Sequence, residues 1–395
     1  MTLKKAFIYT SIVFALLTGL SYAAYAQPLP PSSQPLQLSL KQALALTLAN
    51  NRELKISALD VDRSTQQTQV AKSALLPSAG VSAQIAHYFN EPPFFGFTST
   101  GTASDKIPYG RFGGRDQAGA TAWITQPLYN AATRPSIINA RLQERQSQLA
   151  VQYKETDIAA LLKQTYIQIL VLHERIRLQN ESIQRNKKAL ADARSLLAQG
   201  RALRVDTLRA YASVKSLEPD LLKLSNAIEV GKQQLRTLAG LDSTQEIQLT
   251  DSLVLPETAP VLSESAVYDE ARQHRADLLS LDLQQQQADQ QIKIAASGMK
   301  PSVSLTAQYL IQTQANQFNY FNAYYPSTPF VGAQVSVPIF NGNANKARVS
   351  QAKIEKDQTA LRSQQAYDQL RTEVKQAVAN VRETAARIQT SANVK

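Results

Sequence analysis

The chain has 395 residues, a formal net charge of +11 at pH 7 and no cysteine, so a disulfide framework is excluded. Its 42 Lys and Arg residues are scattered among 31 Asp and Glu residues and many glutamines along helical stretches. A nucleic-acid-binding surface more often gathers basic and aromatic residues on one face, so nucleic acid is not an expected partner.

Residues 1–26 have the pattern of a secretory signal peptide. Lys4 and Lys5 form its charged start, an apolar stretch follows, and Ala24-Tyr25-Ala26 supplies small residues for cleavage. An uncleaved membrane anchor is the alternative, but the apolar stretch holds only about 14 residues and a membrane span needs about 20. Residues 27–38, with four prolines, are expected to form a flexible leader.

A first structural repeat is expected over residues 39–240. It opens with a helix over 39–76, because Ser39 and Gln42 occupy capping-box positions and Pro77 forbids continuation. The apolar period then changes from helical to two. This change predicts two strands, over about 79–90 and 116–127.

Two long helices complete this repeat, over about 132–198 and 203–239. In the first of them, apolar residues recur on a strict seven-residue line: Leu162, Ile169, Ile176, Ile183, Leu190 and Leu197. The second helix alternates apolar residues at three and four positions and contains Pro219, which is expected to kink it. Sustained heptads predict coiled-coil packing against helices of similar length.

A linker over 241–262 leads to a second repeat over 263–395, with strands over about 302–313 and 330–340. The motif Pro77-Ser78 returns as Pro301-Ser302. Likewise, Pro127-Leu128-Tyr129-Asn130 returns as Pro338-Ile339-Phe340-Asn341. The expected fold is therefore mainly α-helical with a small β part, built as a duplicated helix–β-hairpin–helix unit.

The four predicted strands have one apolar and one polar face, and aromatic residues gather around both hairpins. Strands of about 9 to 11 residues with this alternation fit an outer-membrane barrel. The alternative is the core of a soluble β-sandwich, which fits poorly with such long helices between the strands. Four strands are too few to close a barrel, and an open sheet edge is untenable in lipid, so several copies are expected to form one pore.

After the leader, the order of motifs resembles the TolC family of outer-membrane efflux and secretion channels. The opening Leu38-Ser39-Leu40 and Asn50-Asn51-Arg52-Glu53-Leu54 are similar to the family's first-helix signature. Pro127-Leu128-Tyr129-Asn130 and Pro338-Ile339-Phe340-Asn341-Gly342 resemble its strand-to-helix junctions. The returning helix of the family is matched by Gly200, Asp206, Leu208, Ala210 and Leu238-Ala239-Gly240-Leu241.

The resemblance implies a homotrimer in the outer membrane of a Gram-negative envelope, with a large periplasmic part. Three copies would form one 12-stranded β-barrel continued by a long periplasmic α-helical barrel. The channel would be the passive exit duct of a tripartite efflux pump or type I secretion system. Its implied partners are a periplasmic membrane-fusion adaptor and an inner-membrane transporter of the RND, ABC or MFS type.

The resemblance also assigns roles to residues. It implies an adaptor-docking tip at Gly200, Arg201, Ala202 and Leu203, a candidate gate at Asp206, and junctions at Pro127, Asn130, Pro338, Asn341 and Gly342. The residues alone leave an alternative open, in which Gly200 is an ordinary turn glycine and Asp206 an ordinary acid at a helix N-terminus.

The second repeat departs from the family pattern. Counted from Pro338, the second tip and its returning helix would fall beyond Lys395, so the repeat is expected to be incomplete, either as a fragment or as a natural truncation. Two other function classes remain: a periplasmic coiled-coil adaptor or structural protein, and a non-functional fragment. The sequence does not indicate the transported substrate.

Catalytic and metal-binding motifs are not found in the sequence. His87, His173 and His274 lie far apart, and none has a metal-ligand partner at helical spacing. There is also no phosphate-binding loop and no nucleophile elbow. No enzyme activity, cofactor or metal site is expected.

Overall fold

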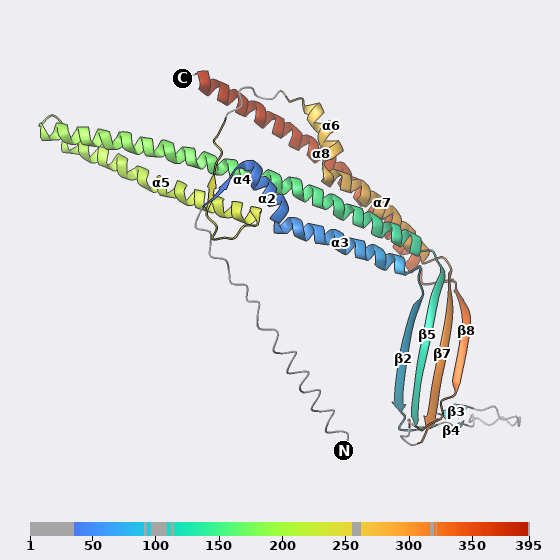
Figure 1. Cartoon of the computed structure of the whole chain (residues 1–395). Coiled ribbons are helices and arrows are strands. Elements are labelled where there is room, and N and C mark those ends of the chain that lie inside the picture. Colours follow the sequence, from blue (N-terminus) through green and yellow to red (C-terminus); the bar gives the residue numbers. More distant parts are fainter. Residues whose placement is uncertain are drawn as a thin grey trace, which may run out of the picture. The chain divides into compact units, whose positions relative to one another are not determined.

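The computed structural model describes residues 35–90, 93–95, 109–111, 114–254, 262–316, 320 and 322–393. The expected signal peptide and most of the leader lie outside these residues. The chain divides into two compact units, one of Met1–Asn51 and Ala159–Val254, the other of Arg52–Ile158 and Leu255–Lys395 (Figure 1). Within the described residues, no helix is both long enough and apolar enough to cross a membrane.

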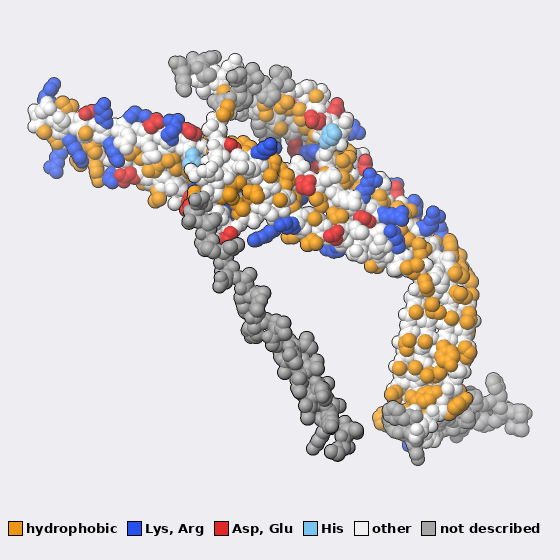
Figure 2. All heavy atoms as spheres, in the orientation of Figure 1, with side chains coloured by type: hydrophobic (Ala, Val, Ile, Leu, Met, Phe, Trp, Pro, Cys, Tyr) orange, Lys and Arg blue, Asp and Glu red, His pale blue; other side chains and the backbone are white. Residues whose placement is uncertain are grey.

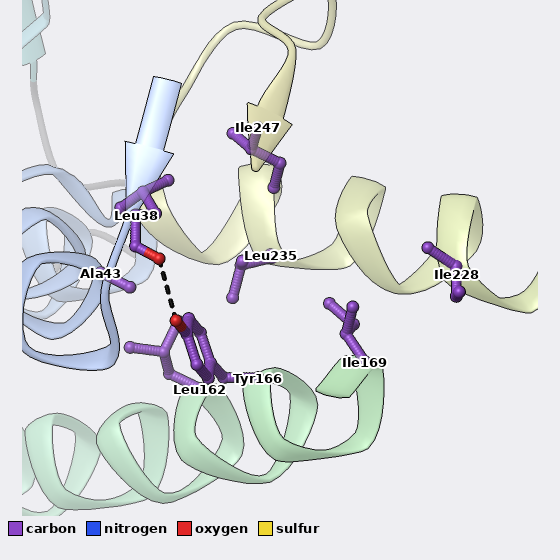
Figure 3. Packing of buried hydrophobic residues seen from close by; sticks show 8 residues of the cluster. All are labelled: Leu38, Ala43, Leu162, Tyr166, Ile169, Ile228, Leu235 and Ile247. Atoms are coloured by element: carbon purple, nitrogen blue, oxygen red, sulfur yellow. Dashed lines mark hydrogen bonds between the residues drawn. The ribbon is translucent and has the colours of Figure 1, made fainter. Parts of the chain in front are cut away.

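The first unit is built on two long helices. It contains α2 (Leu40–Asn50), the part of α4 (Thr133–Ala198) from Ala159 onwards, and α5 (Arg204–Ala239). Its core joins these helices through eight buried residues, shown in Figure 3: Leu38, Ala43, Leu162, Tyr166, Ile169, Ile228, Leu235 and Ile247. All six residues of the seven-residue line on α4 are buried or half-buried, as coiled-coil packing requires.

A short parallel pair of strands closes this core. Strand β1 (Leu36–Leu38) pairs with β6 (Ile247–Leu249). The expected leader over 27–38 therefore ends in a strand, and the expected linker over 241–262 contains another. The buried Tyr166 hydroxyl donates to the Leu38 carbonyl oxygen at 2.9 Å, which fixes β1 to α4 (Figure 3).

The expected helix over 39–76 is two helices, α2 and α3 (Arg52–Ser73), separated at Asn51. The capping box is present: Ser39 N donates to Gln42 Oε1 at 3.0 Å, and Gln42 N donates to Ser39 Oγ at 3.3 Å. Asn51 leaves the helical conformation, and its side-chain amide donates to the Leu238 carbonyl oxygen at 2.8 Å. This bond holds the chain at the break between α2 and α3.

The second unit carries a four-stranded antiparallel sheet. Its strands are β2 (Ser78–His87), β5 (Asp116–Asn130), β7 (Ser302–Ala315) and β8 (Ser327–Ser336), in the order β2-β5-β7-β8. The two hairpins of the duplicated unit thus join through β5 and β7 (Figure 1). A smaller antiparallel pair is formed by β3 (Pro93–Phe95) and β4 (Tyr109–Arg111).

Four strand ends differ from the expected ranges by three or more residues. Strand β2 stops at His87, three residues before 90, and β8 begins at Ser327, three residues before 330. Strand β5 continues three residues past 127, to Asn130, whereas β8 stops at Ser336, four residues before 340. A register shift between Pro127 and Tyr129 lets β5 pass its proline while it still pairs with β7.

The helices of the second unit are α3, the part of α4 up to Ile158, α6 (Glu264–His274), α7 (Ala276–Ser297) and α8 (Ala344–Asn393). Leu278, Leu370, Val374 and Val378 form the buried core between α7 and α8. From Leu370, a seven-residue spacing predicts that the seam of α8 continues through Ala377 and Thr384. This prediction is wrong, because both residues are exposed while Val378 is only 1% exposed. The buried face shifts because α-helical periodicity is 3.6 residues rather than 3.5.

Candidate functional site

The helical tip at Gly200-Arg201-Ala202-Leu203 is a tight turn between α4 and α5. Gly200 has a φ of 72°, Gly200 N donates to the Leu197 carbonyl oxygen at 3.0 Å, and Arg201 N donates to the Leu196 carbonyl oxygen at 2.8 Å. These bonds form a Schellman motif, which satisfies the last carbonyls of α4. Apart from its chain neighbours, no heavy atom of the described residues lies within 4 Å of the position that a Cβ at Gly200 would take, so the turn leaves this side open.

Asp206 caps the start of α5. Its carboxylate accepts a hydrogen bond from Leu203 N at 3.2 Å and lies 4.0 Å from the Arg209 guanidinium. Leu203 itself is 69% exposed beside it. This geometry fits the reading of Asp206 as an acid at a helix N-terminus, where it satisfies a free backbone N–H and interacts favourably with the helix dipole.

The four strands share one apolar face. Directly opposed residues on neighbouring strands lie on the same side of a sheet. The register Val81↔Ala122, Ala122↔Tyr309 and Tyr309↔Pro329 therefore carries this face across all four strands. Its large side chains are exposed, with Val81 78% and Val331 73% exposed, and Figure 2 shows hydrophobic side chains spread over the sheet.

The opposite face of the sheet is mostly polar. It carries Ser82, Gln84, Thr121, Thr125, Ser304, Thr306, Gln308, Gln312 and Gln334. Trp123 is an exception: its ring lies over Gly80 on the neighbouring strand, where a Cβ would come within 2.7 Å of the ring. A sheet with one exposed apolar face and one polar face matches a wall between lipid and water.

Both outer strands have a free edge. In the described part of the sheet, β2 pairs only with β5, and β8 pairs only with β7. Each outer strand therefore presents an edge of backbone N–H and C=O groups to which no further strand of the described sheet is paired.

The strand-to-helix junctions are built differently in the two repeats. In the first, Asn130 Oδ1 accepts a hydrogen bond from Ala132 N at 2.9 Å, directly before α4. Pro338 lies in irregular chain after β8. There, Gly342 adopts a φ of 64° and the Asn341 carbonyl oxygen accepts a hydrogen bond from Ala344 N at 3.2 Å. Glycine suits a left-handed turn of this kind.

One side-chain pair, at the end of the sheet where β2 finishes, was not predicted from the sequence. His87 Nδ1 lies 2.6 Å from Asp116 Oδ1, and Asp116 is 2% exposed. The two residues oppose each other in the β2–β5 register, so only the correct hairpin register could have revealed them. His173 and His274 are exposed on separate helices. No cluster of three or more His, Cys, Asp or Glu within the described residues could hold a metal ion.

Known proteins match this chain over most of its length. The model of the family "Outer membrane efflux protein" matches residues 43–241 and 267–393. The proteases secretion protein PrtF of Dickeya chrysanthemi is 23% identical over 361 residues, covering 87% of this chain and 71% of PrtF. The probable outer membrane lipoprotein SilC of Salmonella typhimurium is 20% identical over 322 residues, covering 80% of this chain and 65% of SilC.

The crystal structure of the outer membrane protein VceC of Vibrio cholerae has the same fold, with a TM-score of 0.69 at 16% identity, covering 90% of this chain and 81% of VceC. Members of the matched family are trimeric outer-membrane channels that work with adaptors and inner-membrane transporters. The chain belongs to the outer membrane efflux protein family, the outer-membrane channels of efflux and secretion systems, which extend into the periplasm.

Proposed function

We propose that this chain forms a homotrimer in which three four-stranded sheets close one 12-stranded β-barrel, continued by a periplasmic α-helical barrel. The observation that carries this proposal is the sheet with an exposed apolar face and free edges on β2 and β8. Free edges are costly in lipid, because no water is present to pair the backbone groups. Pairing β8 of one copy with β2 of the next removes every free edge.

The proposed channel is a passive exit duct. An inner-membrane transporter of the RND, ABC or MFS type supplies the energy and selects the substrate, and a periplasmic membrane-fusion adaptor joins transporter and channel. The adaptor docks at Gly200, Arg201, Ala202 and Leu203, where the exposed turn between α4 and α5 offers a free helical end. The polar face of the sheet then faces the water-filled passage.

We assign further roles to residues and segments on the same basis. Residues 1–26 act as the signal peptide, and residues 39–240 and 263–395 are the two repeats. Asp206 contributes to a gate by holding the start of α5 at the tip. Pro127, Asn130, Pro338, Asn341 and Gly342 form the junctions that redirect the chain from barrel strands to helices.

Purified protein tests this function directly. Detergent-solubilised protein from outer membranes should have the mass of three chains and should produce steady channel currents in planar lipid bilayers. Protein that remains monomeric, or a trimer that conducts no ions in the presence of its adaptor, would contradict the proposal.

A further inference from the structure

Basic residues gather at the tip of the first unit. Between Arg185 and Arg209, the chain has seven Lys and Arg residues and two Asp residues. All seven basic side chains are exposed. Figure 2 shows Lys and Arg side chains around the free end of α4 and α5. This end of the helical hairpin therefore carries a strong positive charge.

Most of these cations have no anionic partner within the described part of the chain. Among the described residues, no carboxylate lies within 4.0 Å of Lys187, Lys188, Arg194, Arg201 or Arg204, which together we call the basic collar. Further along the same helices the pattern is different. Arg177 pairs with Glu174 and Glu181, at 2.8 Å and 2.7 Å. The positive potential is thus concentrated at the tip instead of being cancelled along the helices.

Apolar side chains are exposed among these cations. Leu196 is 40%, Leu203 69%, Val205 44% and Leu208 58% exposed. A helical end that packs on these residues would exclude water from the neighbouring cations, and the lower local dielectric would strengthen their interaction with carboxylates.

An anionic membrane surface is a weaker candidate for this site. Helices that bind membranes segregate apolar and basic residues onto opposite faces. At this tip, Leu203, Arg204 and Val205 are consecutive in the chain and all three are exposed, so apolar and basic side chains are not sorted onto separate faces there. Interleaving of this kind fits a partner that offers apolar and acidic side chains together.

We infer that the basic collar selects a helical hairpin whose apolar end is surrounded by Asp and Glu side chains. The inference rests on the proposed adaptor docking at the tip and adds the chemistry that distinguishes one adaptor from another. Opposite potentials accelerate the encounter of the two tips and disfavour hairpins with basic ends.

This selection is tested with three synthetic helical hairpins that share the same leucine-containing end. Acidic residues surround this end in the first hairpin, glutamines in the second and basic residues in the third. Binding to the immobilised trimer is measured in about 50 mM and about 200 mM NaCl. The acidic hairpin should bind most tightly and weaken at the higher salt. The double substitution Arg201→Glu and Arg204→Glu should weaken it about tenfold and favour the basic hairpin.

Two controls separate the possible causes of failure. Arg141→Glu with Arg145→Glu makes the same charge change at exposed positions of α4 away from the tip, and should leave binding unchanged. The mass of the tip variant in detergent is measured as well, so that lost binding is not mistaken for lost assembly of the trimer. Equal binding of all three hairpins by conducting wild-type trimers would overturn the inference but not the channel function.

Binding to vesicles gives a further decisive outcome. Wild-type trimers are mixed with phosphatidylcholine vesicles that contain one part in four of phosphatidylglycerol. In one outcome, the wild type captures vesicles while the tip variant does not, and the wild type shows no preference for the acidic hairpin. This combined result would assign the collar to anionic lipid and overturn the inference. Capture of neither vesicles nor the acidic hairpin would overturn it as well.

Discussion

At the residue scale, Tyr166 is the polar centre of the first unit. It is 1% exposed, and its hydroxyl lies 2.9 Å from the Leu38 carbonyl oxygen and 3.0 Å from the Asp251 carboxylate. Burial, with a smaller contribution from the hydrogen bond to Asp251, raises the pKa of Tyr166 to about 12. The same carboxylate accepts a hydrogen bond from Leu40 N at 2.7 Å, so one cluster ties together α4, β1 and the start of α2.

Substitution of Tyr166 by Phe should lower the free energy of unfolding by about 1–2 kcal/mol, because it removes a hydrogen bond of a buried hydroxyl. The Leu38 carbonyl oxygen and the Asp251 carboxylate each keep a second donor, Thr250 N and Leu40 N, which limits the loss. Tyr153→Phe is the matched control, since Tyr153 is 45% exposed. Thermal unfolding in detergent, followed by circular dichroism, measures both variants. Equal melting temperatures for Tyr166→Phe and the wild type would contradict the role of this cluster.

A second residue-scale prediction concerns acid sensitivity. Arg275 lies 2.7 Å from both Asp277 and Glu373, which connects α7 to α8. Its hydrogen bond to Asp277 lowers the pKa of that carboxyl, and partial burial opposes this shift. The stabilisation is therefore present above the unfolded pKa of about 3.9 and is lost as the pH falls below it.

Hydrogen exchange of α7 and α8 measures this loss. Protection of the wild type should fall between about pH 6 and pH 3, whereas Asp277→Asn should be less protected at pH 6 and change less with pH. The same pH dependence in both proteins would show that Asp277 is not the responsible group.

At the element scale, α4 and α5 approach closely at a glycine. A Cβ on Gly231 would lie 2.9 Å from Ile169 Cγ1, and Ile169 is 1% exposed. Gly231→Leu should separate the helices and cost about 1–3 kcal/mol through overpacking. Ile169→Ala in the same chain should recover part of this loss by making room. Thermal unfolding of the two single variants and the double variant tests the packing, and additive losses would contradict it.

Sequence patterns predicted those elements whose signal is local. The seven-residue line on α4 and the two-residue alternation of the sheet gave correct buried and apolar faces, because both periods are read from neighbouring residues. The pairing of Leu36–Leu38 with Ile247–Leu249 had no such signal, since three-residue strands that meet across the chain have no period to detect.

The candidate tip was only partly predictable. Gly200 was placed in a turn from the sequence, but the Schellman bonds and the capping by Asp206 depend on backbone geometry that no motif specifies. The basic collar was also missed, because its residues are divided between α4, α5 and the turn that joins them, and only the hairpin brings these parts to one end. The turn between α4 and α5 gathers these basic residues on one end of the hairpin.

At the scale of the whole molecule, the central claim is that neighbouring copies complete the barrel. The apolar face and the free edges of β2 and β8 belong to one sheet. The proposed trimer would therefore turn the apolar face to lipid and pair both edges in the same assembly. The chain has no native cysteine, so introduced cysteines report on these edges without background.

Disulfide cross-linking between the two outer strands tests this claim most directly. Val81→Cys on β2 is combined with single cysteines along β8, from Thr328→Cys to Val335→Cys, and intact outer membranes are oxidised. At one register, we expect bonds between chains that convert the protein into covalent trimers and nothing larger, while each single variant stays monomeric on denaturing gels. Bonds formed only within one chain, at every register, would contradict it.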